Sequence, residues 1–158
     1  MPVFSVDYRL APRNPYPDPV NDCYQAYVWI MTQAEEQLGM KIKHVILAGD
    51  SAGGHLALSV NLLAILRGFR RPDGLLIHYP VCHTDINRFY PSMLMSVDDI
   101  MLSLPFRKIF LGCFLRAGGN PDKSPICSPL LAPLALLRLL PPMRIFACEI
   151  DSLRDQAF

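Results

Sequence analysis

The sequence has 158 residues, 51% of them hydrophobic and 18% charged, and a formal net charge of +1 at pH 7. These values are typical of one soluble globular domain with a sizeable apolar core, and they give no reason to expect nucleic acid or an anionic membrane surface as a partner. The 5 cysteines include no C-x-x-C pair, so we expect reduced thiols of an intracellular protein rather than a disulfide framework or a zinc site.

The N-terminal part is predicted to contain one strand and one helix. Residues 3–6 are β-prone, and 4 prolines between positions 12 and 19 then keep the chain extended. Over residues 20–38 the apolar side chains fall at helical spacing, and Gly39 is a suitable helix stop. No secretory signal follows the first residue, and the most apolar run, residues 130–140, is too short to span a bilayer. We therefore expect a cytoplasmic protein without a transmembrane segment.

The next segment carries the most informative motif. Residues 44–48 form an apolar run that predicts a buried strand, and residues 56–68 predict a helix. Between them lies Gly49-Asp50-Ser51-Ala52-Gly53-Gly54, a G-x-S-x-G turn in the strand–turn–helix context of a nucleophile elbow. Glycines are expected around the serine because the turn is strained and the backbone approaches closely. The alternatives are a glycine-rich turn without chemistry or a phosphate loop, but neither phosphate-binding glycine pattern is present.

The remaining elements complete an α/β pattern. Residues 75–80 predict a second buried strand, residues 81–104 are irregular and rich in methionine, residues 106–115 predict a short helix, and residues 143–150 predict a last strand. Continuous apolar strands separated by helices indicate a parallel sheet covered on both faces. Functional residues in such sheets follow the carboxyl ends of strands, where Ser51 and Asp151 both lie.

Five parts of the sequence, in this order, resemble the hormone-sensitive-lipase family of α/β-hydrolases: residues 7–12, 49–54, 79–81, 128–132, and 140–142 followed by 151–155. The resemblance covers essentially the whole chain. It implies an α/β-hydrolase fold, with a mostly parallel sheet and helices on both faces, incomplete at both ends. Residues 1–158 would then be a partial catalytic domain that lacks the family's His-Gly-Gly-Gly strand and loop upstream and the segment with the catalytic histidine downstream.

The same resemblance assigns roles to individual residues. Ser51 would be the nucleophile, Asp151 the acid of a Ser-His-Asp triad, and the backbone N–H of Ala52 one donor of the oxyanion hole. The elbow itself would consist of Gly49, Asp50, Gly53 and Gly54. A serine hydroxyl needs an imidazole to take its proton, and the imidazole needs a carboxylate to hold it. The implied substrates are lipid or other hydrophobic acyl esters, such as acylglycerols, including those at a lipid-droplet or membrane surface, and no cofactor or metal is implied.

Because the triad histidine is absent, we expect this chain alone to be inactive. The histidines within it have other interpretations: His44 and His78 lie at or in strands, and His55 is expected to point along its helix. His83 follows a strand end and is a weak candidate for the base. Asp155 is an alternative triad acid, although we favour a supporting role.

Three further expectations concern Asp50, the methionine-rich residues 93–104 and the function of the chain. Asp50 is expected to secure the turn through hydrogen bonds, and the methionine-rich residues 93–104 could line an acyl pocket or pack in the core. For function, the alternatives to an esterase or lipase are a non-catalytic, receptor-like member of the same family that binds a small molecule, or a structural fragment without a ligand.

Overall fold

The computed structural model describes residues 2–100 and 102–158, apart from the side chain of Met95. Met101 and the Met95 side chain, both within the stretch considered for an acyl pocket, lie outside this description. The elements in chain order are α1 Asp18–Thr32, α2 Ala34–Leu38, β1 Ile46–Asp50, α3 Ala52–Leu66, β2 Gly74–His78, the 3-10 helix η1 Pro91–Ser96, α4 Leu104–Leu115, η2 Pro129–Leu131, α5 Leu134–Leu137, β3 Met143–Phe146 and η3 Arg154–Gln156.

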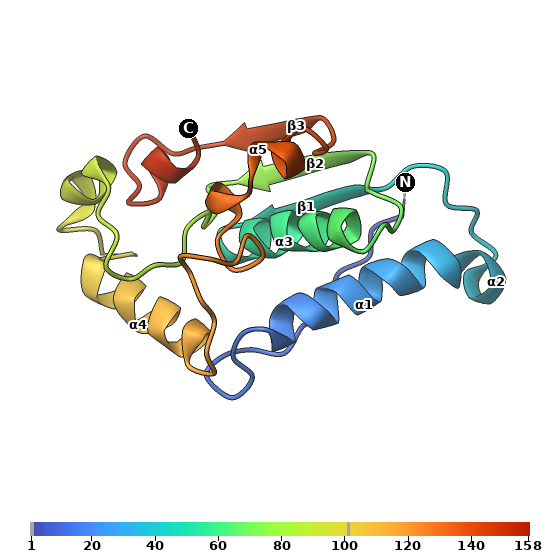
Figure 1. The fold of residues 1–158 in the computed structure, drawn as a ribbon, viewed down its shortest axis with the longest axis horizontal. Helices are drawn as coiled ribbons and strands as arrows, with labels where there is room; N and C mark the ends of the chain where they lie inside the picture. Colours follow the sequence, from blue (N-terminus) through green and yellow to red (C-terminus); the bar gives the residue numbers. More distant parts are fainter. Residues whose placement is uncertain (1, 101) are drawn as a thin grey trace.

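The three strands form one parallel sheet in the order β1-β2-β3 (Figure 1). Leu47 lies opposite Leu75 in the first ladder, and Ile77 lies opposite Ile145 in the second. Because all strands run in one direction, their carboxyl ends meet at the same edge of the sheet. The predicted parallel sheet is confirmed, and this edge is where the residues after β1, β2 and β3 converge.

One face of the sheet carries the core. Helix α3 packs against β1 and β2, and α1 packs against α3. Leu75 and Ile77 point toward this side and are buried, together with Leu58 of α3. A second cluster joins Tyr27 of α1 to Val60 of α3. Helix α3 is buried along most of its length. The burial of Leu58 and Val60 against the sheet and α1 therefore fixes the helix that begins directly after Ser51.

The other face of the sheet is open in the described chain. Alternate residues point to opposite faces of a strand, and on this face Ile46 is 56% exposed and Leu76 is 36% exposed. In Figure 1, α3 and α5 lie on the same side of the sheet. The expectation of helices on both faces is therefore met on one face only. Helix α3 packs on the face that carries Ile77, and α1 packs on α3.

Several boundaries differ from the sequence predictions for reasons of pairing. Residues 3–6 form no strand, since no described backbone segment pairs with them. Strand β1 begins at Ile46 and continues through Asp50, because Gly49 and Asp50 pair with the end of β2. Strand β3 ends at Phe146, opposite His78, where β2 also ends. A strand needs a neighbour to continue, and local sequence does not show where that neighbour stops.

The helices were predicted at the correct places with different ends. The single helix expected over residues 20–38 is divided at Gln33, whose φ of −121° interrupts it, and Gly39 ends the second part with a φ of 65°, as expected. Helix α3 starts at Ala52, four residues before the predicted start, so the turn leads into it without a linker. No helix in the described part of the chain is both long and apolar enough to cross a bilayer.

Candidate active site

Ser51 occupies a sharp turn between β1 and α3. Its backbone adopts φ 51° and ψ −114°, a conformation that non-glycine residues rarely take. Its N–H donates to the carbonyl of His78 at 2.9 Å, and its own carbonyl accepts from the N–H of His55 at 3.1 Å. The turn is thus tied to the end of β2 on one side and to the first turn of α3 on the other. The predicted bend at the exit of a strand is confirmed.

The glycines around Ser51 are not equivalent. A Cβ added at Gly49 would lie 2.4 Å from the backbone of Gly53, which no side chain can tolerate. A Cβ at Gly54 would lie 3.2 Å from side-chain atoms of Ile77 and Pro80, so Gly54 lets α3 approach β2. A Cβ at Gly53 would meet nothing within 4 Å. Close approach therefore excludes a side chain at Gly49 and crowds one at Gly54, and the sequence expectation fails at Gly53.

Asp50 does not secure the turn. Its carboxylate accepts no hydrogen bond from any residue within the described ranges, and the side chain is exposed. The reason is the alternation of the strand: Asp50 lies on the open face with Ile46 and Ala48, away from α3. The turn is held instead by backbone hydrogen bonds and by the close approach of Gly49 to Gly53.

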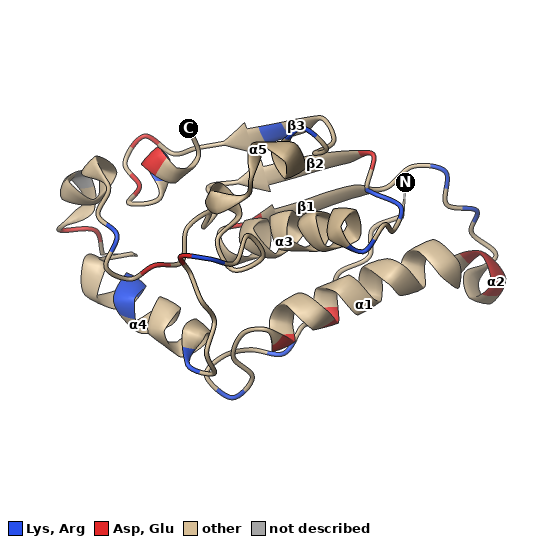
Figure 2. Ribbon diagram, in the orientation of Figure 1, with Lys and Arg blue, Asp and Glu red and all other residues tan. Residues whose placement is uncertain are grey.

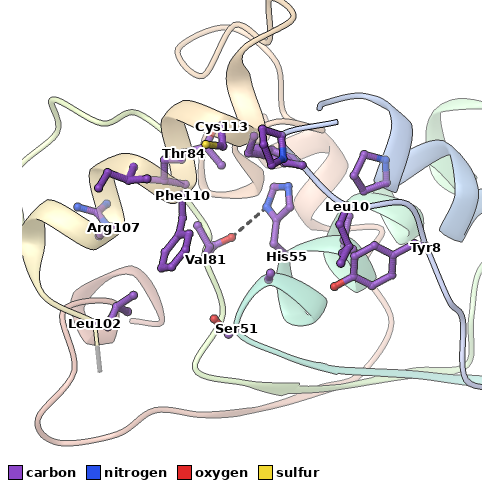
Figure 3. A pocket seen from close by; sticks show the side chains of 18 of the residues that line it. Tyr8, Leu10, Ser51, His55, Val81, Thr84, Leu102, Arg107, Phe110 and Cys113 are labelled. Carbon is purple, nitrogen blue, oxygen red and sulfur yellow. Dashed lines mark hydrogen bonds between the residues drawn. The ribbon is translucent and has the colours of Figure 1, made fainter. Parts of the chain in front are cut away.

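Ser51 and Ala52 line a cavity of about 460 Å³ (Figure 3). Its wall is largely apolar and comes from the segment before α1, the Ser51 turn with the start of α3, the loops after β2, α4, and Leu153 after β3. Lining side chains include Tyr8, Leu10, Val81, Leu102, Phe110 and Cys113. Of the stretch considered for an acyl pocket, Leu102 lies in the wall, whereas Met93 is buried and its sulfur accepts a hydrogen bond from Arg107. Within that stretch, Leu102 thus fits the interpretation as pocket lining, and Met93 fits the interpretation as part of the core.

The start of α3 supplies backbone donors beside Ser51. The N–H of His55 is bonded to the Ser51 carbonyl, so the N–H groups of Ala52, Gly53 and Gly54 precede the first hydrogen bond of the helix. Such N–H groups at a helix N-terminus favour negative charge. Ala52 borders the cavity, and its N–H is therefore suited to an oxyanion that forms next to Ser51.

His55 is a buried structural residue. Its Nδ1 lies 3.0 Å from the carbonyl oxygen of Val81, drawn in Figure 3, and its Nε2 lies 3.4 Å from the hydroxyl of Ser59. Burial lowers the pKa of His55 to about 4, against the bond to Val81, which raises it. The ring was expected to point along α3. It contacts Ser59 along the helix, but it also crosses to the segment that follows β2.

No other histidine meets Ser51 either. His44 is exposed beside Asp73, with Nδ1 3.5 Å from the carboxylate, and His78 packs edge-on against Phe146. His83 is buried, but its Nδ1 lies 2.7 Å from the Tyr90 hydroxyl, and its ring is not part of the cavity wall. Within residues 2–158 as described, Ser51 therefore has no imidazole partner.

Asp151 and Asp155 differ in how their carboxylates are used. Oδ1 of Asp151 accepts from the N–H of Leu153 at 2.8 Å, and its second oxygen accepts no hydrogen bond from the described residues. Burial raises the pKa of the Asp151 carboxyl, the bond from Leu153 opposes this, and the charge of Asp99 adds to the rise. Asp151 thus has an oxygen left for a partner.

Asp155 is engaged within the protein. It accepts from the backbone N–H of Ser92 at 2.7 Å and pairs with Arg154 at 3.2 Å. The bond from Ser92 lowers the pKa of the Asp155 carboxyl, and the partnership with Arg154 lowers it further. These bonds attach the segment after β3 to η1, which agrees with the supporting role expected for Asp155.

Gln156 also positions this segment, and the sequence analysis missed it. Its Oε1 accepts from the N–H groups of Cys82 and His83 at 3.0 and 2.9 Å. The side chain is 2% exposed. The segment that carries Asp151 is thereby fixed to the chain that leaves β2, close to Val81 in the cavity wall. A glutamine after a predicted strand gives no local signal, because both bonds join residues more than 70 positions apart.

Comparisons with known proteins agree with this geometry. A family model described as the alpha/beta hydrolase fold matches residues 1–158. The hormone-sensitive lipase of Mus musculus is 42% identical over 104 residues, which are 66% of this chain and 13% of the lipase. Carboxylesterase NlhH of Mycobacterium tuberculosis is 34% identical over 153 residues, which are 97% of this chain and 47% of the esterase.

Solved structures show the same similarity. The hyperthermophilic esterase from the archaeon Pyrobaculum calidifontis superposes with a TM-score of 0.84 at 30% identity, over 97% of this chain and 49% of that one. A bacterial heroin esterase superposes with the same TM-score of 0.84 at 32% identity, over 95% of this chain and 47% of that one. The chain therefore spans about half the length of these esterases.

Proposed function

Since this chain belongs to the hormone-sensitive-lipase family of α/β-hydrolases, we propose that Ser51 is the nucleophile of a carboxylic-ester hydrolase and Asp151 the acid of its triad. The observation that carries the proposal is the Ser51 turn: a serine at φ 51°, at the exit of a strand, on the wall of an apolar cavity. A strained backbone of this kind persists only where the surrounding structure holds it, and such strain concentrates at functional sites.

In the proposed reaction the Ser51 hydroxyl attacks the ester carbonyl carbon while an imidazole takes its proton. The negative charge that develops on the carbonyl oxygen is stabilised by backbone donors that include the N–H of Ala52. The imidazolium then gives its proton to the departing alkoxide, and the acyl group remains on Ser51. Water, activated by the same imidazole, releases the acid. Asp151 orients the imidazole through its free carboxylate oxygen and stabilises its charge.

We propose Asp151 rather than Asp155 for this role because of its free oxygen. The triad acid must accept the N–H of the imidazole. Asp155 already accepts the N–H of Ser92 and pairs with Arg154, so its use would break both contacts. Ser51 and Asp151 follow β1 and β3, and both strands end at the same edge of the sheet.

The base is the part that the described residues do not supply to Ser51. His55 is committed to Val81 and Ser59, and His83 to Tyr90. Removal of a triad histidine costs about 10⁶ in turnover in serine hydrolases of this type. We therefore propose that these 158 residues alone do not turn over esters, and that activity requires a histidine from outside them.

The cavity indicates the substrate class. Its wall is apolar apart from Ser51 and a few polar groups, which favours a hydrophobic acyl chain over a charged one. Phe106, Ile109 and Phe110 of α4 are each more than 50% exposed, and two of them, Ile109 and Phe110, belong to the cavity wall. Such a rim suits esters presented by a lipid surface, such as acylglycerols. The relatives reported above are lipases and esterases, which favours hydrolysis over receptor-like binding.

The experiment compares the 158-residue chain with the longest open reading frame that contains it, using p-nitrophenyl butyrate. We expect hydrolysis by the longer protein, its loss in Ser51→Ala, and no change in the surface control Ser5→Ala. The 158-residue chain should show no rate above its own Ser51→Ala background. Hydrolysis by the longer protein that survives Ser51→Ala would contradict the assignment, and retention of an ester without Ser51-dependent turnover would favour the receptor-like alternative.

A further inference from the structure

His83 is a buried side chain with an unused ring nitrogen. The residue is 3% exposed, and its Nδ1 lies 2.7 Å from the hydroxyl of Tyr90. Its Nε2 has no hydrogen-bond partner among the described residues. When Nδ1 carries the proton and donates to Tyr90, Nε2 presents a lone pair to which no described residue donates a hydrogen bond. A histidine whose first nitrogen is held by a hydrogen bond and whose second is free is arranged as metal-ligating histidines are.

Two carboxylates converge on the same place. One ring nitrogen of His83 and one carboxylate oxygen from each of Asp85 and Asp122 lie within 4.8 Å of one another. Asp85 follows β2, whereas Asp122 lies in the turn after α4. Figure 2 shows acidic residues where the segment after β2 passes the segment that leaves α4. The cluster is thus formed by the fold and not by neighbours in sequence.

The carboxylates of Asp85 and Asp122 are close to each other, and the charge of Arg107 acts on Asp85 without forming an ion pair with it. Neither is in any ion pair of the described chain. Two negative charges this close repel each other, and a cation between them removes that cost. From these contacts we propose that His83, Asp85 and Asp122 bind one divalent transition-metal ion, for which Zn²⁺ is the test case.

The donor set selects the kind of ion. One imidazole and two carboxylates suit Zn²⁺, Co²⁺ or Mn²⁺ better than Mg²⁺ or Ca²⁺, which prefer oxygen ligands alone. Ligand atoms around a tetrahedral Zn²⁺ are about 3.4 Å apart, given bonds of roughly 2.1 Å. The ligand atoms, which lie within 4.8 Å of one another, therefore need to close by at most about 1.4 Å. Asp122 is exposed in a turn, so it can make this movement, and water completes the coordination.

The surrounding charges set the strength of the site. Arg88 and Arg107 act electrostatically on His83 and oppose a cation, while Asp85 and Asp122 favour one. We therefore expect a single ion of moderate affinity. The ion would link the segment after β2 to the turn after α4. Thr84, the residue between two of the proposed ligands, lines the cavity, so the proposed site is adjacent in sequence to the cavity wall.

The test is a titration of the purified chain with Zn²⁺ by isothermal calorimetry and with Co²⁺ by visible absorption. We expect one ion per chain and at least a tenfold weaker affinity in Asp122→Asn. Because Asp122 is exposed, this change should leave the fold intact, which circular dichroism checks. Asp98→Asn, another exposed aspartate, is the matched control and should bind as the unchanged chain does.

His83→Gln provides the second arm and should also lose the ion, together with the imidazole contribution to the Co²⁺ spectrum. Absence of saturable binding would overturn the proposal. So would equal affinity in Asp122→Asn and Asp98→Asn, or a thiolate-to-Co²⁺ charge-transfer band, which would place the ion on a cysteine. Ester hydrolysis does not enter these measurements, so their outcome is independent of the function proposed for Ser51.

Discussion

The backbone N–H of Ser51 donates to the carbonyl of His78 at 2.9 Å, which joins the serine turn to the last residue of the neighbouring strand. This bond means that the position of Ser51 depends on the register of β1 and β2, in which Asp50 lies opposite His78. The turn is therefore a property of the sheet as much as of its own sequence. How well the turn tolerates a substitution should therefore depend on the space around the substituted residue, which differs between Gly49, Gly53 and Gly54.

The first prediction compares two glycines of the turn. Gly49→Ala places a Cβ 2.4 Å from the Gly53 backbone and should destabilise the protein by about 2 kcal/mol or more. Gly53→Ala enters open space at the start of α3 and should be neutral or stabilising by up to about 1 kcal/mol, because alanine favours helix. Urea unfolding midpoints of the two variants measure the difference. Equal midpoints would show that the close approach at Gly49 is absent.

The second prediction concerns the strain at Ser51. A non-glycine residue at φ 51° and ψ −114° costs about 1–3 kcal/mol, whereas glycine takes this conformation without the same penalty. Ser51→Gly should therefore be more stable than Ser51→Ala, which keeps the Cβ, by about 1 kcal/mol. The two variants remove the same hydroxyl, so their difference isolates the backbone. Thermal unfolding measures it, and a less stable glycine variant would exclude strain at this position.

The sequence predicted the parts of the site that depend on local chemistry. The G-x-S-x-G turn identified the bend at Ser51 because the glycine requirement at Gly49 arises within five residues of chain. The parallel sheet followed from the continuous apolar runs now seen as β1, β2 and β3. In both cases the physical cause lies inside a short segment, so the pattern of residue types is sufficient.

The features that the sequence did not predict depend on distant partners. Residues 3–6 have the composition of a strand but no described neighbour to pair with. Gln156 holds the segment of Asp151 through residues 82 and 83, and His55 reaches the carbonyl of Val81. These contacts join parts of the chain that are 26 or more positions apart in sequence, so no periodicity or short motif reports them.

The third prediction concerns acid sensitivity. Burial lowers the pKa of His55 from 6.5 to about 4 in the folded protein. Between these values the unfolded chain binds a proton that the folded chain does not, so stability falls as the pH decreases from 6.5 to 4. The loss from this group is on the order of 3 kcal/mol. Well above pH 6.5 both states are neutral and His55 contributes no pH dependence.

His55→Gln tests this assignment, since its amide keeps a donor for the Val81 carbonyl but does not titrate. The variant should show a weaker decrease of the unfolding free energy between pH 6.5 and 4 than the unchanged chain. His44→Gln, at an exposed site, is the control and should keep the full decrease. An unchanged slope in His55→Gln would assign the acid sensitivity to other groups.

The last prediction distinguishes the two aspartates that follow β3. In carbon-detected NMR titrations, the Asp151 carboxyl should have a pKa above its ordinary value because burial disfavours its charge, and the Asp155 carboxyl one below it because Ser92 and Arg154 favour its charge. Asp155→Asn should lower the urea midpoint of unfolding, since it loses the charge that pairs with Arg154. Asp151→Asn should leave the midpoint unchanged or raise it, because a neutral side chain removes a charge that burial disfavours.

In the longest open reading frame the order of the two variants reverses for ester hydrolysis. Asp151→Asn should abolish hydrolysis, whereas Asp155→Asn should reduce it only as far as it loosens the segment after β3. The reverse pattern, with hydrolysis lost in Asp155→Asn alone, would make Asp155 the triad acid.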